Sequence, residues 1–515
     1  MKEIELKLLP EIAYDKEKLN LFISQKFQGK HFLILRRSID ARRKKVLVLV
    51  KIQVSEKPIS NNTKYQTENL PQVENQAEVI IVGSGPAGLF AALKCIEKGI
   101  KPIVLERGKD VQARRIDLAN INKKHIVNPE SNYCFGEGGA GTYSDGKLYT
   151  RSTKRGNVQQ ILEILVAHGA TKNILIDAHP HIGTNKLPKV IQSIRQTIIE
   201  HGGEIHFDKK VTDIILKNET ILGVKCGRQS IKGIGVILAT GHSARDVFEL
   251  LNNRGVALEA KPFALGLRVE HSQQLIDSRQ YSCDNRGKFL PAASYSLKAQ
   301  IPYKGQRQGV FSFCMCPGGF IVPSATAQNQ VVVNGMSPSR RDSKFANSGI
   351  VVTIDQNDFQ KYSHKGALAG MYLQQEIEEK ACLVAGSTQS APAQLLSDFV
   401  RKKISNTLLD TSYQPGLVSA DLTEVLPQKV SYVLQEGFKR FGKKINGYLT
   451  NEAQVIGVES RTSSPVKIPR NKESHEHIQI KRLYPCAEGA GYAGGIISAA
   501  IDGENCAKKL IERYT

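Results

Sequence analysis

The residues with the clearest chemical meaning form the glycine-rich turn Gly83-Ser84-Gly85-Pro86-Ala87-Gly88. The turn follows a short apolar run at residues 78–82 and precedes a segment of good helix formers. Gly83 would permit a tight turn, Gly85 would let the backbone approach a pyrophosphate, and Gly88 would allow a helix to pack closely on a strand. The N-terminus of that helix would present free N–H groups and a partial positive charge to phosphate oxygens.

A second apolar run, residues 101–105, is followed by Glu106 and Arg107. Glu106 lies about 20 residues beyond the turn, where an acid is placed to accept hydrogen bonds from the ribose hydroxyls of a dinucleotide. Strand, turn, helix and acid-terminated strand together predict a βαβ dinucleotide site. The glycine pattern recurs at residues 136–141 and 489–494. Neither copy is expected between a strand and a helix with an acid-terminated strand downstream, so we assign phosphate binding to the first alone.

Three further segments resemble the FAD-binding flavoproteins that have two dinucleotide-binding domains. Residues 235–241 have the pattern of a buried strand that ends in Ala-Thr-Gly, and Glu488 stands where the family usually has aspartate. Residues 493–500 place a glycine pair before an apolar helix, whose N-terminus would stabilise negative charge on reduced flavin. Because these segments lie far from the first turn in sequence, the resemblance implies an FAD domain interrupted by a substrate domain.

Over essentially the whole chain, the sequence is similar to an uncharacterised bacterial family of FAD-dependent, NAD(FAD)-utilising dehydrogenase-like proteins with an extra N-terminal α+β domain. The resemblance rests on residues 37–42, 135–148, 313–319 and 457–466. It implies FAD bound non-covalently and oxidoreductase activity, but it supplies no substrate.

The residues expected to contact FAD lie in five groups along the chain. They are Gly83, Gly85, Pro86, Ala87 and Gly88; Glu106 and Arg107; Gly138, Gly139, Ala140 and Gly141; Ala239, Thr240 and Gly241; and Glu488, Gly494, Gly495 and Ile496. In related flavoproteins the third group passes close beside the isoalloxazine ring, where any side chain would collide with it.

The sequence offers four candidates for catalysis: Lys147, His179, His181 and Arg461. Lys147, with Asp145, would contact substrate or form a surface ion pair. A histidine near flavin would act as an acid or base at neutral pH, although loop histidines are more often structural. Arg461 would clamp a carboxylate or phosphate, or pair with Glu459 instead.

The nine cysteines are scattered, which indicates reduced thiols. Cys314-Met315-Cys316 has the pattern of a strand that runs into a turn, and buried structural thiols are favoured there over a reactive pair. His475-Glu476-His477 lies in a polar stretch with no partner cluster expected nearby, and no four-ligand zinc spacing occurs, so no metal is expected.

The element pattern predicts an α/β fold, a three-layer ββα FAD-binding domain of the Rossmann type interrupted by an α+β substrate domain, with a small N-terminal α+β domain. The expected boundaries are 1–56 for the N-terminal domain, 57–77 for a polar linker, 78–255 and 457–515 for the two parts of the FAD domain, and 256–456 for the substrate domain. The substrate domain is expected to be a mixed sheet with helices at residues 363–384 and 427–441.

The chain has 515 residues and a net charge of +22. A solvated surface explains this charge more simply than a polyanion partner, although residues 36–45 form a basic run that we expect to be a hairpin. No secretory signal or bilayer-spanning apolar run is visible, which predicts a soluble cytoplasmic protein without membrane attachment.

These features favour a FAD-dependent oxidoreductase that acts on a small molecule, with NAD(P)H as a hypothetical transient electron donor. Two alternatives stay open. The charge suggests a flavin-dependent tRNA-modifying protein, for which nucleic acid would be a partner, and the family pattern is also compatible with a non-enzymatic protein that holds FAD as a structural prop. The sequence does not determine the oligomeric state.

Overall fold

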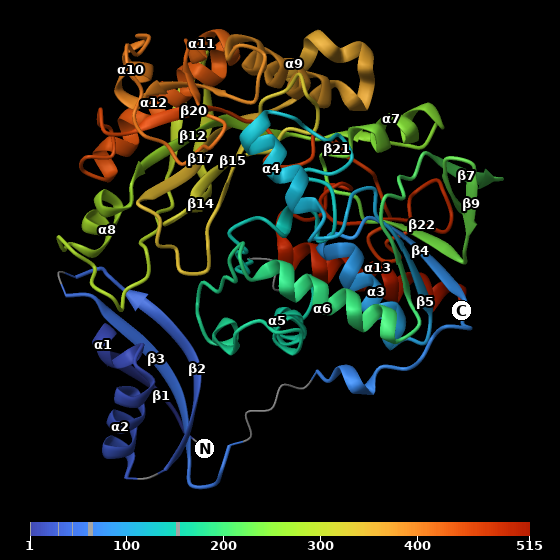
Figure 1. Ribbon diagram of the computed structural model, residues 1–515, viewed down its shortest axis with the longest axis horizontal. Coiled ribbons are helices and arrows are strands. Elements are labelled where there is room, and N and C mark those ends of the chain that lie inside the picture. Colours follow the sequence, from blue (N-terminus) through green and yellow to red (C-terminus); the bar gives the residue numbers. More distant parts are fainter. Residues whose placement is uncertain (1, 29, 44, 60–64, 151–154) are drawn as a thin grey trace.

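The computed structural model describes residues 2–28, 30–43, 45–59, 65–150 and 155–515. Of the six sheets in these residues, three form the frames of the N-terminal unit, the central domain and the cap. Residues 60–64 of the predicted linker and Lys44 of the basic run lie outside the described residues. Figure 1 shows a small N-terminal unit at lower left, a parallel sheet at the right and a larger sheet with its helices at the top. Among the described residues, no helix is both long and apolar enough to cross a bilayer.

The N-terminal unit is an antiparallel sheet in the order β1-β3-β2 that carries two helices. Its elements are β1 (Lys2–Leu8), α1 (Pro10–Ala13), α2 (Lys16–Phe27), β2 (His31–Asp40) and β3 (Leu47–Ser55). Helix α2 begins where the Asp15 carboxylate accepts hydrogen bonds from two backbone N–H groups of the first turn. The predicted hairpin is confirmed, because β2 and β3 pair antiparallel with Asp40 opposite Leu47, and the first half of the basic run belongs to β2.

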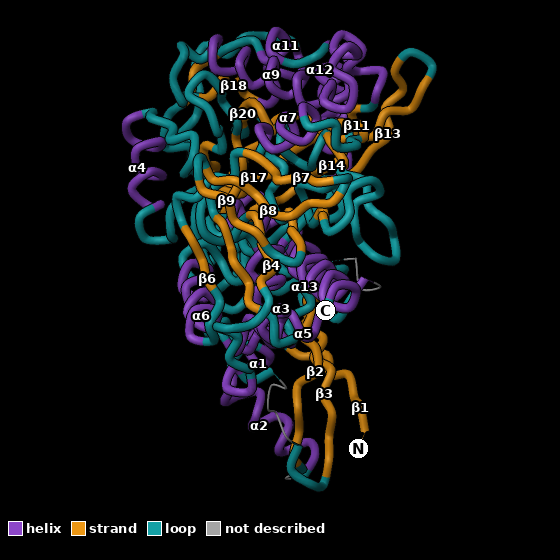
Figure 2. The backbone as a smooth tube through the Cα atoms, turned by 90° about the vertical axis from the view of Figure 1, so that its right-hand side faces the viewer, coloured by secondary structure: helices purple, strands orange, loops and turns teal. Residues whose placement is uncertain are grey.

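Strand β2 joins the N-terminal unit to the body of the protein (Figure 2). The Arg37 N–H donates to the carbonyl of Ile176 at 2.8 Å, and the Arg37 carbonyl accepts from the N–H of Ala178 at 2.9 Å. The Arg37 guanidinium pairs with Asp177 at 2.8 Å. The stretch 37–42, which carries part of the family resemblance, therefore includes a docking contact between two units.

The central sheet is parallel and has the order β22-β10-β4-β5-β6. Its strands are β4 (Glu78–Val82), β5 (Lys101–Leu105), β6 (Glu204–His206), β10 (Gly235–Leu238) and β22 (Leu483–Pro485). Strand β22, near the C-terminus, pairs with β10, so the last part of the chain completes the sheet to which β4, the strand before the first glycine turn, belongs.

The central sheet has a different layer on each face. Val79 and Ile81 pack against a helical layer, and Ile80 and Val82 pack against a β-meander and α7. The helical layer contains α3 (Pro86–Glu97), α5 (Val158–Ala167), α6 (Leu187–Glu200) and α13 (Ile496–Tyr514). The other layer contains β7 (Asp213–Lys217), β8 (Thr220–Cys226), β9 (Gln229–Lys232) and α7 (Arg245–Asn253). The predicted three-layer ββα fold is confirmed.

The third sheet, the cap sheet, is mixed and has the order β13-β14-β17-β12-β20-β18-β19. Its strands are β12 (Phe263–Ser272), β13 (Lys298–Tyr303), β14 (Gln306–Cys316), β17 (Phe345–Ile354), β18 (Ala391–Leu395), β19 (Leu417–Ser419) and β20 (Gln454–Glu459). Its helices are α8 (Gln273–Tyr281), α9 (Ala369–Val384), α10 (Leu396–Arg401), α11 (Leu422–Val425) and α12 (Gln428–Lys444). Strand β20 runs through the expected boundary at 456/457.

The helix expected at residues 363–384 begins later, at Ala369. It is preceded by the 3-10 segment η5 (Gln356–Leu368), in which Gly366 has φ of 56° and Tyr362 is also non-helical. A left-handed glycine interrupts the helical path, and apolar spacing in the sequence does not reveal it.

Helices α3 and α13 come from opposite ends of the central domain and lie side by side (Figure 1). A Cβ atom at Gly503 of α13 would lie 2.1 Å from the carbonyl oxygen of Ala87 in α3. Only glycine permits this approach, so Gly503 sets the separation of the two helices.

We predict that Gly503→Val lowers the free energy of unfolding by about 1–3 kcal/mol, since the added side chain forces α13 away from α3. Urea unfolding measures the change, and Lys508→Ala on the exposed side of α13 is the control, expected to stay within about 0.5 kcal/mol of wild type. Equal stability of Gly503→Val and wild type would contradict the close helix contact.

Candidate functional site

A cavity of ≈ 400 Å³ lies between the central sheet and the cap sheet. It is lined by residues that directly follow β4, β5, β10 and β22, because the carboxyl ends of parallel strands meet at one edge of a sheet. The cap contributes Phe313, Cys314, Asn334, Arg461 and Thr462. A volume of this size is typical of small-molecule and cofactor sites.

Most of the residues predicted to contact the cofactor line this cavity. The exceptions are Gly88 and Gly138, where an added Cβ would lie 1.9 Å from the carbonyl oxygen of Gly83 and 2.0 Å from Oγ1 of Thr142. These two glycines allow tight packing behind the wall of the cavity. The third glycine copy, 489–494, does lie between a strand and a helix, β22 and α13, and its last residue lines the cavity.

The wall of the cavity has the features of a phosphate cradle. A Cβ atom added at Gly85, Gly241, Gly494 or Gly495 would meet no protein atom within 4 Å, so these cavity-lining glycines leave space that a ligand would fill. Helices α3 and α13 both begin at this wall, after Gly85 and Gly495, and neither has a capping side chain. Their first N–H groups are therefore suited to an anionic ligand.

Glu106 lines the cavity but already accepts four hydrogen bonds from the protein. One carboxylate oxygen accepts from the N–H and the hydroxyl of Ser84 at 2.9 and 2.8 Å, and the other accepts from the N–H groups of Gly108 and Gly136 at 2.9 and 3.0 Å. A ribose hydroxyl would share the carboxylate with the rotatable hydroxyl of Ser84. Glu106 thus also ties three loops of the site together.

Arg107 lies beside Glu106 and is held by two acids. Its guanidinium pairs with Glu130 at 2.6 Å and with Asp246 at 2.8 Å, and its Cζ lies 4.1 Å from the ring centroid of Phe135. Since Phe135 and Asp246 also line the cavity, this group forms a rigid wall at the Glu106 end.

Lys147 and Asp145 are not a surface ion pair, because Asp145 is 1% exposed and both residues line the cavity. Asp145 pairs with Arg341 at 2.6 Å, and its carboxylate lies 3.9 Å from Nζ of Lys147. Nζ of Lys147 donates to the carbonyl of Met315 in the cap. Lys147 therefore joins the loop after the glycine segment to strand β14.

The histidines proposed from the sequence do not line the cavity, and His242 does. The rings of His179 and the cavity-lining Tyr149 are tilted against each other with centroids 5.1 Å apart, and Nε2 of His181 lies 3.1 Å from the carbonyl oxygen of Ser339. These contacts belong to the loop that receives the N-terminal unit. His242 had no signal in the sequence beyond its place after the Ala-Thr-Gly segment.

Arg461 lines the cavity, but most of its donors are already used. It makes hydrogen bonds of 3.1 and 2.9 Å to the Glu378 carboxylate and one of 3.0 Å to Gln330. The predicted alternative partner, Glu459, instead pairs with Arg268 at 2.7 Å. Arg461 is thus mainly part of a buried ion pair; the alternative pairing with Glu459 is wrong, and the role of an anion clamp stays a prediction.

Glu488 and His242 form a titratable pair at the cavity, 3.8 Å apart. Burial and the nearby Cys314 raise the pKa of Glu488 to about 7. Burial and the charges of Arg461 and Arg245 lower the pKa of His242 to about 4. His242 is therefore neutral at pH 7, while Glu488 is poised to bind or release a proton.

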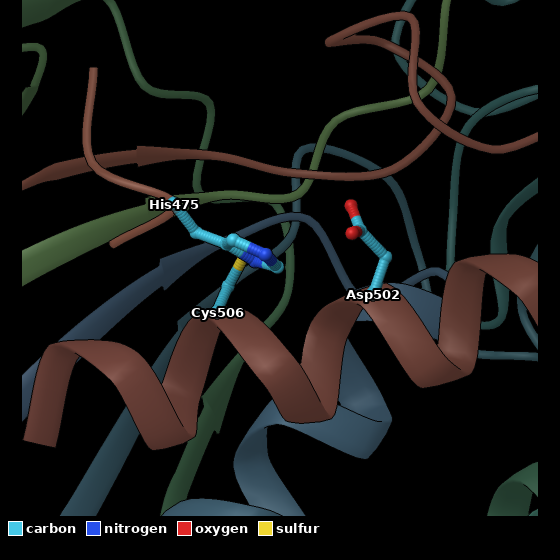
Figure 3. Close-up of side chains that lie close together, drawn as sticks. All are labelled: His475, Asp502 and Cys506. Atoms are coloured by element: carbon cyan, nitrogen blue, oxygen red, sulfur yellow. The ribbon is translucent and has the colours of Figure 1, made fainter. Parts of the chain in front are cut away.

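A second group of ligand-type side chains lies away from this cavity. His475, Asp502 and Cys506 offer atoms within 4.8 Å of one another, so the expectation that His475 has no partner cluster is wrong (Figure 3). However, Arg470 pairs with Asp502 at 2.6 Å and donates to Cys506 at 3.3 Å. A guanidinium thus already neutralises the carboxylate that a metal ion would need, and these residues do not fit a metal site.

Comparisons with known proteins agree with a flavin site. Residues 78–117 match an FAD binding domain, residues 262–462 match the family described as "FAD-dependent protein, C-terminal domain-like", and residues 1–55 match a domain of unknown function. An uncharacterized protein of Clostridium beijerinckii is 40% identical over 498 residues, which cover 93% of this chain and 92% of that protein.

The chain also has more distant similarities, at lower identity, to named proteins. Thiamine thiazole synthase of Methanococcus vannielii is 27% identical over 197 residues, 36% of this chain and 64% of that protein. Among solved structures, CtdE in complex with FAD and substrate has a TM-score of 0.34 at 12% identity and covers 85% of each chain. Glycine oxidase of Bacillus cereus has a TM-score of 0.31 at 13% identity and covers 85% of this chain and 96% of its own.

The match to an FAD binding domain covers β4, α3 and β5, which form one wall of the cavity. The bare glycines and uncapped helix ends at that wall suit a pyrophosphate. The protein therefore binds FAD, and the segment that matches the FAD binding domain lies at the wall of this cavity.

We predict that Gly85→Val weakens FAD binding at least tenfold, or about 1.4 kcal/mol, because its side chain would fill open cavity space. Flavin fluorescence titration measures the affinity. Without flavin, Gly85→Val should have the same free energy of unfolding as flavin-free wild type. Gly88→Ala should have a lower one, since its Cβ would lie 1.9 Å from the Gly83 carbonyl oxygen. Undiminished affinity in Gly85→Val would place FAD elsewhere.

We also predict a pH-dependent stability difference between wild type and Glu488→Gln. The pKa of Glu488 rises from 4.5 to about 7 on folding, so between these values the folded protein binds more protons than the unfolded chain. The wild type therefore loses stability as pH rises through this window, and Glu488→Gln does not.

Urea unfolding of the flavin-free proteins at pH 5 and pH 8 tests this sign. The advantage of Glu488→Gln over wild type should grow by roughly 2 kcal/mol between the two pH values. Glu504→Gln is a matched comparison, because burial also raises the pKa of Glu504 to about 7 and Glu504 lies outside the cavity. If the stability difference between Glu488→Gln and wild type were the same at both pH values, the pKa of Glu488 in the folded protein would not be raised.

Proposed function

This chain belongs to the same family as the uncharacterized protein of Clostridium beijerinckii, and we propose that it is a FAD-dependent oxidoreductase of the dehydrogenase or reductase type. The proposal includes two features that the family resemblance implies: an activity like that of NAD(FAD)-utilising dehydrogenases, and non-covalent binding of FAD.

Support comes from one feature of the cavity: side chains that hold protons or stabilise charge face the same space as the FAD cradle. Glu488, His242 and Lys147 come from three separate segments of the central domain, and Cys314 comes from the cap. A protein that kept FAD only as a structural prop would not need a carboxyl poised at neutral pH in this place.

Bound FAD supplies the capacity to accept and return a pair of electrons with a proton. The chain contributes placement and proton handling. The glycine turn and the N-termini of α3 and α13 would hold the pyrophosphate, and Phe313 and Thr462 line the cavity from the cap. Glu488, with its pKa raised to about 7 mainly by burial, would take up or release the substrate proton.

NAD(P)H is the proposed transient electron donor. The sequence carries one complete βαβ dinucleotide motif, at residues 78–106, and FAD is assigned to it. A nicotinamide would therefore approach from the cap side of the cavity, where Asn334 and Phe313 lie. The substrate itself would be a small molecule that reaches the same side.

Anaerobic mixing of the purified holoprotein with NADH and with NADPH tests the proposal. At least one nicotinamide should bleach the visible flavin absorbance, and air should restore it. Gly85→Val, which is expected to lose its flavin, controls for bleaching of free cofactor. Flavin that is bound but unresponsive to both nicotinamides would exclude this donor, and a protein that takes up no flavin would exclude the oxidoreductase.

A further inference from the structure

The end of β14 departs from a regular strand at its two cysteines. Phe313 pairs with Gly349 and Cys316 pairs with Asn347, so the register shifts between them. Cys314 has a backbone φ of 47°, a left-handed conformation that residues other than glycine seldom adopt. Such bulges re-aim side chains and are common beside active sites.

The bulge places the two thiols in different surroundings. Cys314 lines the FAD cavity, whereas Cys316 is 0% exposed and its Sγ lies 3.3 Å from the carbonyl oxygen of Cys314. In a regular strand, Cα atoms two residues apart are about 6.6 Å apart, near the upper limit for a disulfide. The sequence-based preference for a pair of buried structural thiols assumed that regular strand, and for Cys314 it is wrong.

Two cations lie against this short segment. Nζ of Lys147 donates to the carbonyl of Met315, between the cysteines, and Nη1 of Arg268 donates to the carbonyl of Cys314 at 3.3 Å. A hydrogen bond from Cys316, together with the charges of Lys147 and Arg268, lowers the pKa of the Cys314 thiol. A lowered thiol pKa at an accessible position is typical of reactive cysteines.

The acids near the pair act in the opposite direction. The charged groups that face the two thiols are Lys147 and Asp145 from the loop after the glycine segment, Arg268 from β12, Glu459 from β20 and Glu488 from the loop after β22. Asp145 and Glu459 are themselves paired with Arg341 and Arg268. The net field at Cys314 is therefore set mainly by Lys147.

We propose that Cys314 and Cys316 are a redox-active dithiol that exchanges two electrons with the FAD bound in the same cavity. Oxidation breaks two S–H bonds, forms one S–S bond and releases two electrons and two protons. The flavin takes up the two electrons with the protons, and the reverse transfer reduces the disulfide. The exchange balances between these two couples and needs no further reactant.

This inference rests on the proposed function and names a substrate class for it. A thiol or disulfide substrate would meet Cys314 first, because Cys316 is fully buried. Lys147 acts as a positioning residue whose charge, with the hydrogen bond from Cys316, favours the thiolate form of Cys314.

Reductive titration of the air-oxidised holoprotein is the first test. Anaerobic dithionite should deliver four electrons per chain to wild type, two for the flavin and two for the disulfide, but only two to Cys314→Ser and to Cys316→Ser. Cys283→Ser is the control and should take up four, since Cys283 lies outside the cavity. If flavin-loaded wild type took up only two electrons per chain, the proposal of a redox-active dithiol would be wrong, and the proposal of an oxidoreductase would not be affected.

Thiol trapping tests the pair without relying on the flavin. The flavin-free full chain is equilibrated in glutathione buffers, alkylated and digested with trypsin, which releases residues 308–340 with both cysteines in one peptide. The oxidised peptide should resist alkylation and lack two hydrogens. A pair that stays fully alkylated at every glutathione ratio would overturn the inference even if no flavin binds.

The alkylation rate of Cys314 at neutral pH tests the role of Lys147. Loss of the Lys147 charge should raise the pKa of the Cys314 thiol and lower its thiolate fraction, so Lys147→Gln should react with iodoacetamide more slowly than wild type. Lys147→Arg should retain most of the rate. Equal rates in wild type and Lys147→Gln would overturn the assignment of Lys147 to the thiolate.

Discussion

The FAD site depends on the direct contact of backbone with backbone between segments that are far apart in the chain. Gly503 lets α13 touch the carbonyl of Ala87, and an added Cβ at Gly489 would lie 2.2 Å from the carbonyl oxygen of Thr240. Strand β22 pairs with β10 in the same region. Without these approaches the N-terminus of α13 and Glu488 would not reach the cavity, so the last 30 or so residues complete a site that begins at residue 83.

The cap is held over the cavity by buried ion pairs. Glu378 of α9 accepts hydrogen bonds from Arg245 of α7 and from Arg461, and the two guanidinium groups lower its pKa to about 2 against the opposing effect of burial. Removing one partner of such a group would leave an uncompensated buried charge. The pairs therefore give the joint between cap and central domain a defined geometry, which suits a site whose reactive side chains come from both.

Local sequence patterns predicted the elements well where neighbouring residues alone decide the structure. The run at 78–82, the glycine turn and the following helix were predicted because turn chemistry and apolar periodicity act over a few residues. The predicted start of the helix at residue 363 failed because a single left-handed glycine, Gly366, interrupts it. The regular strand assumed at Cys314 failed because pairing with β17 introduces a bulge there.

The sequence by itself determined the dinucleotide motif, since this follows from residue types at fixed short spacings, and its resemblance to known flavoproteins implied the interrupted domain and the other glycines that line the cavity. Only the tertiary structure decided the partners of charged and polar side chains. Arg461 pairs with Glu378, His179 and His181 contact Tyr149 and Ser339, and His242, Glu488 and Cys314 line one cavity. The physical reason is that the partner of a side chain depends on which distant segment packs beside it. The spacing of residues along the chain does not determine which segments come together.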